Sequence, residues 1–233
     1  MAPPPPPPAV FKYTFDPSLA EFNVTPQQWL DNNDKHFQGI AVANVVFKGE
    51  DDDRVLLVQR AAHDSMPNRW EVTGGAAEED VVEGEPELSD EEKLAKAAAA
   101  GEHPRNTILS GAARELWEEA GLVATHFTHL VPQPAEAPLR DATEAPPPAY
   151  PDHKGFIYTN RTGTVLYLRF AFHVLVESTA QVTLDPNEHQ DYVWANEEEV
   201  RAGMTEEMKD IPATVPATRS YILEAFRLRK LEK

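Results

Sequence analysis

Three glutamates, Glu115, Glu118 and Glu119, are the residues of this chain whose type and spacing most clearly indicate chemistry. Spacings of three and four residues place side chains on adjacent turns of one helix face. Like charges at this spacing destabilise an isolated helix by roughly 0.2–0.5 kcal/mol per pair, so a positive partner is expected to face them. Carboxylates suit a divalent cation such as Mg²⁺ in that position. A solvated helix face is the alternative, and the spacing alone favours it.

The neighbouring residues place these glutamates on one edge of a core-packed helix. Asn106 or Thr107 can cap its start, and Gly121 suits the left-handed position that ends a helix. A helix from about 107 to 120 is therefore predicted. Apolar residues recur at helical intervals on its opposite side, namely Ile108, Leu109, Ala112, Ala113, Leu116 and Ala120.

Two stretches around these glutamates resemble a known family. Residues 114–122 read Arg-Glu-Leu-Trp-Glu-Glu-Ala-Gly-Leu, which matches the second half of the Nudix box, R-E-U-x-E-E-x-G-U, where U is aliphatic. Residues 70–75 resemble the Trp-x-x-Pro-Gly-Gly approach to that box, with Thr73 in place of the proline. The chain is thus similar to the Nudix hydrolase superfamily from about 38 to about 200. The resemblance implies an α/β fold, a Nudix-like α/β/α sandwich with a mixed β-sheet between helices.

The resemblance also implies a metal site. In the family the box glutamates hold divalent cations, the carbonyl of the second glycine is often a ligand, and an acidic residue of a later loop adds a ligand or the general base. That later residue is expected to be Glu188, in a Glu-His-x-x-Tyr-x-Trp run similar to that of diadenosine tetraphosphate hydrolases, with Asp191 as second choice. Arg114 is expected to orient the box by pairing with a glutamate. The implied metal ligands are Gly75, Glu115, Glu118, Glu119 and Glu188, and the implied catalytic residues are Arg114 and these four glutamates.

The implied reaction is hydrolysis of a phosphoric anhydride, which needs charge neutralised on non-bridging oxygens and a water aimed in line with the leaving group. Mg²⁺ is the expected cofactor, with Mn²⁺ as the alternative. The expected substrate is a small-molecule nucleotide, a nucleoside diphosphate linked to another moiety, such as a dinucleoside polyphosphate, a nucleotide sugar or a nucleoside triphosphate. A catalytically weak, nucleotide-binding regulatory protein of the same fold is the second hypothesis. Isomerase chemistry on isoprenoid diphosphates resembles enzymes with a catalytic cysteine, which this chain lacks.

Three further residues are candidates for substrate binding. Arg60 ends a predicted strand near the place where the resemblance puts phosphates, although a surface arginine needs no function. Tyr167 and Arg169 share one face of a long predicted strand with His173. They are expected either to line a phosphate or base pocket or to form a polar sheet face under a helix.

The remaining elements follow from periodicity and turn residues. The final helix is expected to turn Leu228 inward and Arg229 outward. Strands are predicted at 37–48, as a central strand, and at 54–60, 122–131, 155–159 and 164–177, with a hairpin turn at 160–163, and helices at 25–32, 196–202 and 218–233.

One domain, 10–233, is expected, with three decorations. Residues 1–9 carry six consecutive prolines and are predicted to form a disordered tail, and 132–153 form a proline-rich loop. Residues 76–106 are an acidic insertion within the Nudix box, either a lid or a mobile surface loop. An insertion of about 25 residues costs little stability, because closure entropy grows only logarithmically with length. Asn106 stands where the first half of the family's box has a glutamate.

Composition narrows the classes of partner. A net charge of −18 argues against a general nucleic-acid-binding surface, so an anion site must be built locally from metal ions and a few arginines. The absence of cysteine excludes disulfides and thiol chemistry. No apolar run is long enough for a membrane span, and no signal peptide is recognisable. A cytoplasmic protein is expected, with a nuclear one as the alternative, and the oligomeric state stays open.

Overall fold

The computed structural model describes residues 11–33, 37–49, 52–77, 92, 106–134, 155–159 and 165–232. The expected proline-rich tail, the predicted turn at 160–163, and most of the acidic insertion and of the proline-rich loop lie outside the described residues. Among the described helices, none has both the length and the apolar character that crossing a membrane requires.

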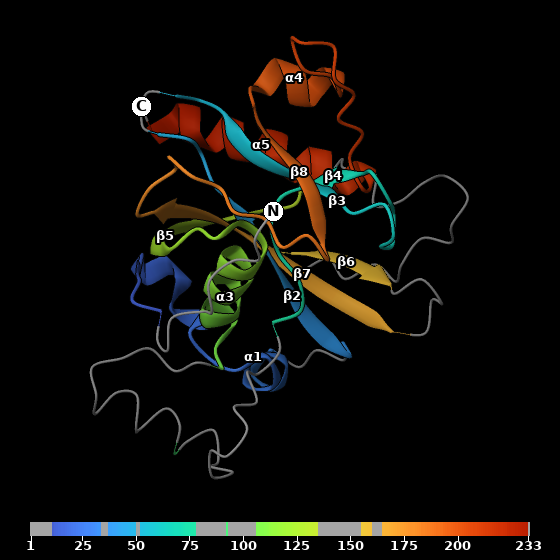
Figure 1. Cartoon of the computed structure of the whole chain (residues 1–233). Helices are drawn as coiled ribbons and strands as arrows, with labels where there is room; N and C mark the ends of the chain where they lie inside the picture. The colour runs from blue at the N-terminus through green and yellow to red at the C-terminus, as the bar shows by residue number, and fades with distance from the viewer. Residues whose placement is uncertain are drawn as a thin grey trace.

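The described chain forms the helices and strands drawn in Figure 1. Most lie where the sequence pattern predicts them, including the carboxylate-bearing helix. In chain order they are β1 (Thr14–Phe15), the 3-10 helix η1 (Pro17–Phe22), α1 (Pro26–Asn32), β2 (Gly39–Val45), β3 (Val55–Arg60), β4 (Trp70–Glu71), α3 (Ile108–Ala120), β5 (Ala124–Val131), β6 (Phe156–Thr159), β7 (Leu166–Val176), β8 (His189–Ala195), α4 (Glu197–Ala202) and α5 (Pro216–Glu232).

The strands form two sheets. The larger has the order β1-β5-β7-β2, with β6 beside the first part of β7, and it is mixed, because β2 runs parallel to β7 while β5 and β6 run antiparallel to it. This confirms the predicted mixed sheet. A second, antiparallel sheet with the order β4-β3-β8 was not anticipated. Residues 73–77 run along the free edge of β2, where the Val42 amide donates to the Gly75 carbonyl at 2.9 Å.

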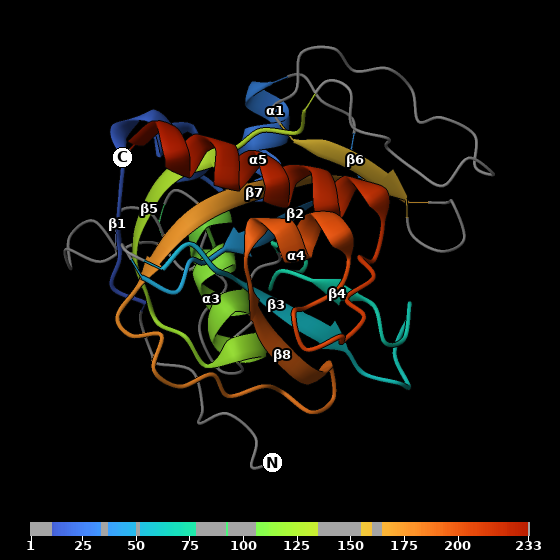
Figure 2. The ribbon, with the colours of Figure 1, turned by 90° about the horizontal axis from the view of Figure 1, so that it is seen from above.

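Helices cover both faces of the mixed sheet, which gives the predicted α/β/α arrangement (Figures 1 and 2). On one face α3 contributes Leu109 and Leu116 to a core that includes Phe170 and Phe172 of β7. On the other face α5 contributes residues such as Phe226 to a second core. Alternate residues of β2 and β7 point to opposite faces, so both faces are apolar because each is covered by a helix.

The outward orientation predicted for Arg229 is wrong. Its side chain is buried under α5, where Nε donates to Asp53 Oδ1 at 2.6 Å and the guanidinium lies 4.4 Å from the centre of the Phe47 ring. Leu228, predicted to face inward, is only half-buried. Position 229 continues the buried stripe of Ala225 by one helical turn, and a charge is tolerated there because a carboxylate and an aromatic face receive it.

Candidate functional site

Helix α3 holds the carboxylates through well-defined ends. Thr107 caps its start, since its Oγ1 accepts from the Ser110 amide at 3.1 Å while Ser110 Oγ accepts from the Thr107 amide at 2.8 Å. Gly121 ends the helix in the left-handed conformation, with φ 65°. Glu115 and Glu119 are buried, and Glu118 is half-exposed.

The glycine pair brings backbone against these carboxylates. Gly74 has φ 149°, and its amide donates to Glu119 Oε2 at 2.5 Å. A Cβ on Gly74 would lie 2.2 Å from the Val42 carbonyl oxygen, and one on Gly75 would lie 2.6 Å from Glu115 Oε2. Gly74 therefore needs glycine, whereas a Cβ on Gly75 would displace the Glu115 carboxylate. The Gly75 carbonyl accepts from Val42, and its second lone pair is available to a cation.

Arg114 pairs with two of the glutamates. Its Nη1 donates to Glu118 Oε2 at 2.5 Å and its Nη2 to Glu115 Oε1 at 2.7 Å. Nη2 also donates to the Ala76 carbonyl at 3.0 Å. The guanidinium thus fixes two carboxylates relative to the segment that follows the glycine pair, and its pairing with glutamate is the one that the sequence suggested.

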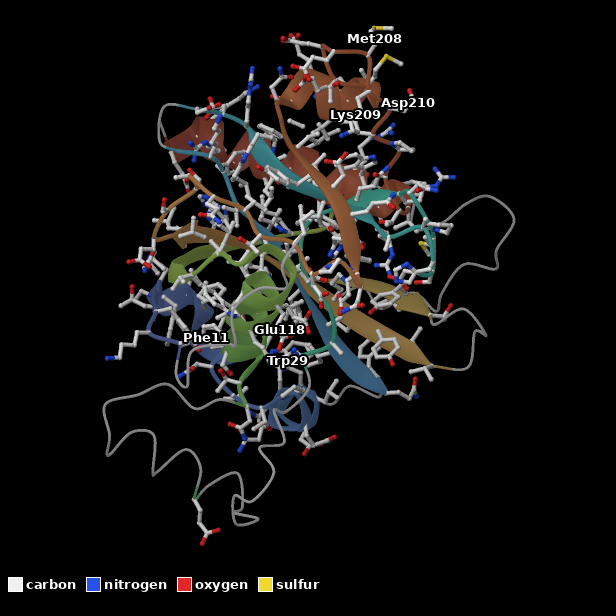
Figure 3. All side chains as sticks on the ribbon, viewed as in Figure 1. Phe11, Trp29, Glu118, Met208, Lys209 and Asp210 are labelled. Atoms are coloured by element: carbon white, nitrogen blue, oxygen red, sulfur yellow. The ribbon has the colours of Figure 1, made fainter. Side chains whose placement is uncertain are left out.

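Glu188 approaches the cluster from the start of β8. A ligand atom from each of Glu119, Glu188 and His189 lies within 4.8 Å of the other two. Glu188 is exposed and His189 is buried. Asp191, the second choice, is not in this group, because it pairs with Lys209 in the loop after α4. Figure 3 shows that loop far from Glu118 on α3.

The carboxylates raise one another's affinity for protons. Burial raises the pKa of Glu115 to about 7, and the neighbouring Glu118 and Glu188 add to the rise while Arg114 opposes it. Burial also raises the pKa of Glu119, and Glu115, Glu71 and Glu188 raise it further. The carboxylate oxygens and this excess of negative charge fit a hard divalent cation, and His189 adds a nitrogen donor beside Glu119 and Glu188.

Glu71 is a buried acid beside this cluster that sequence reasoning missed. Its Oε1 lies 2.5 Å from Arg60 Nη1 and 3.9 Å from His189 Nε2. Burial would raise the pKa of Glu71, but the nearby His189 ring and the charge of Arg60 hold it below its ordinary value. The signal in the sequence was a lone charge between the apolar residues Trp70 and Val72.

Arg60, expected near phosphates, is largely occupied by protein groups. Besides Glu71 it binds the Asp64 carboxylate, and its Nε donates to the Ser65 carbonyl at 2.6 Å. Arg60 therefore contacts the cluster through Glu71, whose carboxylate it holds near Glu119. His189, next to Glu188 in the run that carried the resemblance, is a second residue that sequence reasoning left out.

Tyr167 and Arg169 join a stack that also includes Tyr158 of β6. The Tyr158 and Tyr167 rings lie 5.3 Å apart with an interplanar angle of 17°, and the Arg169 guanidinium is 4.9 Å from the centre of the Tyr158 ring. All three are half-buried. His173 is not in this group, because it contacts His129 of β5 instead. Tyr158 was not predicted, since its contact with Tyr167 depends on the register in which β6 pairs with β7, although a hairpin of these two strands was predicted.

A model of the NUDIX domain family matches residues 38–215, most of the chain. The chain belongs to the Nudix family. The match spans both the glycine pair and the carboxylates of α3, so the box that the sequence suggested lies within the matched Nudix domain. Asn106, in place of the usual glutamate, is buried at the start of α3.

Solved structures similar to this Nudix chain share little sequence with it. The MutT protein from Methanosarcina mazei Go1 is 19% identical with a TM-score of 0.45, and the match covers 84% of this chain and 96% of that one. A MutT NUDIX hydrolase from Burkholderia pseudomallei is 14% identical with a TM-score of 0.43, covering 80% and 96%. A C. elegans Ap4A hydrolase is 18% identical with a TM-score of 0.39, covering 70% and 84%. No curated protein matches the chain.

Both described ends of the acidic insertion lie against the first half of the Nudix helix. A Cβ on Gly111 of α3 would lie 3.2 Å from Ala77 Cα, so the small residues let the segment after the glycine pair pack closely on the helix. Asn106 leads directly into the capping residue Thr107. The insertion thus leaves the domain about one helical turn before Glu115, opposite Gly111, and re-enters it at Asn106, about two and a half turns before Glu115.

Proposed function

We propose that this Nudix protein is a divalent-metal-dependent hydrolase of phosphoric anhydride bonds in nucleoside diphosphates linked to another moiety. The observation that carries the proposal is the convergence of Glu119 and Glu188, from α3 and from the start of β8, within 4.8 Å of each other and of His189. Glu115 joins this negative field, because Glu188 contributes to its raised pKa. Clustered carboxylates with raised pKa values contribute little to the stability of the fold, and such shifts are common at catalytic sites.

The cation would be held by Glu115, Glu118, Glu119 and Glu188, with the Gly75 carbonyl as a further ligand, and Mg²⁺ is the expected ion with Mn²⁺ as the alternative. When bound, it supplies positive charge to the non-bridging phosphate oxygens. Glu188, being exposed, is the carboxylate best placed to take the proton of an attacking water.

The remaining residues position these carboxylates. Arg114 holds Glu115 and Glu118 at a fixed separation, and the Gly74 amide holds Glu119. Arg60 acts through Glu71 rather than on phosphate directly. Rigid support of this type matters because small misplacements of catalytic groups cost large factors in rate.

Tyr167 and Arg169, with Tyr158, are proposed to receive the nucleotide. Their stack offers half-exposed aromatic faces and one cation, which suit a base and the negative charge of a phosphate. The rest of the Arg169 face is covered, since the Phe156 ring beneath it stacks on Tyr221 of α5 at 5.5 Å.

The test is a panel of nucleoside diphosphate derivatives incubated with Mg²⁺, with the products identified by mass. A nucleotide and a second phosphorylated product are expected, and Glu115→Gln and Glu119→Gln should each lower turnover strongly without unfolding the protein. Glu198→Gln, at an exposed position on α4, is the matched control. Wild-type rates in both site variants would overturn the roles assigned here. Stabilisation by a nucleotide without any product would favour the regulatory hypothesis.

A further inference from the structure

A second group of metal-binding side chains lies away from the carboxylate helix. His129 of β5 and His173 of β7 are paired directly across the antiparallel ladder, and their ring centres are 5.1 Å apart. The last turn of α5 brings Glu232 Oε1 to 3.1 Å from His129 Nδ1. One ligand atom from each of the three residues lies within 4.8 Å of the other two. Helix α5, which carries Glu232, lies on the opposite side of the mixed sheet from α3 (Figure 2).

A shift in strand register brings these histidines together. The pairing of β5 with β7 shifts between Phe127 and His129, and Thr128 and His129 both contact His173 as a result. Thr128 Oγ1 lies 2.8 Å from His173 Nδ1 and 3.0 Å from His129 Nδ1. A hydroxyl has one proton to donate, so Thr128 cannot donate to both rings.

Each imidazole keeps a nitrogen that none of the described protein groups satisfies. Nε2 of His129 and Nε2 of His173 have no hydrogen-bond partner among the described residues, and the His173 side chain is only 3% exposed. Buried polar atoms are nearly always paired, so two such rings side by side need an explanation. Burial lowers the pKa of both imidazoles, which keeps them in the neutral, metal-binding form.

We propose that His129, His173 and Glu232 bind a first-row transition ion of the Zn²⁺ type at a site independent of the Nudix carboxylates. Two imidazoles and one carboxylate suit such an ion, whereas Mg²⁺ prefers oxygen ligands alone. Glu232, with half of its side chain exposed at the end of α5, is free to close the distance to the bond lengths of about 2.0–2.2 Å that Zn²⁺ requires. The positive charge of Arg229 nearby is compensated by Asp53.

The bound ion would tie the last turn of α5 to β5 and β7. These three elements lie far apart in the sequence but side by side in the fold. Among the described residues, the contact that joins Glu232 to the sheet is its ion pair with His129. Metal binding is therefore expected to stabilise the folded chain, because the unfolded chain does not hold the three ligands together.

The test is calorimetric titration with Zn²⁺ in excess Mg²⁺, performed on the full chain carrying Glu119→Gln so that the carboxylate cluster is weakened. One equivalent of Zn²⁺ should bind. Adding His129→Gln or Glu232→Gln should weaken its binding by about 10-fold or more, because each removes a ligand and the loss of even an outer-shell partner of a ligand commonly costs that much. Adding His126→Gln, in the same strand but bonded to Thr14, should leave the affinity unchanged.

Melting curves without Zn²⁺ report whether each variant is folded. If His129→Gln proves destabilised, the Zn²⁺ affinity of Glu232→Gln, which changes an exposed residue, is the deciding measurement. Absence of Zn²⁺ binding in the Glu119→Gln background would overturn the proposal. Equal affinity in the Glu232→Gln variant, or equal weakening by His126→Gln, would overturn it too. Glu232→Gln in the otherwise wild-type chain should leave Mg²⁺-dependent hydrolysis unchanged, which separates this proposal from the proposed function.

Discussion

The amide of Gly74 donates to Oε2 of Glu119 at 2.5 Å, so the glycine turn and the carboxylate helix are joined by a direct hydrogen bond. Two residues 45 positions apart thereby fix one another: the turn needs its positive φ to present the amide, and the buried carboxylate needs a donor. The acidic insertion lies between them in sequence, and both residues of the contact lie outside it. This explains how the Nudix box can be split without separating its two halves in space.

Gly75→Ala should reduce activity by displacing Glu115. The added methyl would lie 2.6 Å from Glu115 Oε2, so the carboxylate must move, and a displacement of about 1 Å can cost about 100-fold in rate. Steady-state hydrolysis measures the effect. Gly49→Ala is the matched control, because nothing lies within 4 Å of its added Cβ. Wild-type activity in Gly75→Ala would show that the position of Glu115 is unimportant.

Glu71→Gln should destabilise the fold and also lower activity. The change removes the charge that Arg60 faces in a buried pair, and the loss of such a charged hydrogen bond costs about 1–3 kcal/mol. Chemical denaturation measures the change in unfolding free energy. Glu224→Gln, whose partner Arg227 is well exposed, should cost under about 1 kcal/mol. Equal effects of the two substitutions would contradict the assignment of Glu71 as a support of the site.

Mg²⁺ should raise the melting temperature more at about pH 8 than at about pH 5.5. Burial raises the pKa of Glu115 to about 7, so folding favours its protonated form. The stability that this group contributes without metal is present below its ordinary pKa and is lost as the pH rises through about 7.

The metal ion requires the ionised carboxylate, so it restores more stability at the higher pH. Melting curves with and without Mg²⁺ at the two pH values measure the difference. The double variant Glu115→Gln, Glu119→Gln is the control, and its response to Mg²⁺ should be small at both. A Mg²⁺ effect in the wild-type chain that does not change with pH would count against the carboxylate cluster as the metal site.

Arg229→Ala should destabilise the protein by about 1–3 kcal/mol, because it removes a buried side chain that pairs with Asp53 and packs on Phe47. Arg227→Ala, two residues away on the exposed side of the same helix, should leave the unfolding free energy nearly unchanged. Denaturant titration of both variants compares them directly. A larger loss for Arg227→Ala would mean that its exposed ion pair with Glu224 contributes more than the buried contacts of Arg229.

Local features of the sequence were sufficient for the carboxylate helix and for most strands. The capping residue, the apolar stripe and the terminal glycine of α3 act within a few residues of one another, so their spacing alone predicts the helix and which side the glutamates occupy. The two-sided apolar pattern of residues 37–48 likewise indicated a strand covered on both faces.

Tertiary structure decided what depends on distant partners. The pairing of β3 with β4 and β8 places Glu71 and His189 beside the glutamates. Arg229 is buried because Asp53 and Phe47 lie beneath α5. The register shift in β5 that brings His129 and Thr128 to His173 has no signature in the local residue pattern. Helical spacing is a property of neighbouring residues, whereas strand register and buried charge pairs are set only when elements far apart in the chain meet.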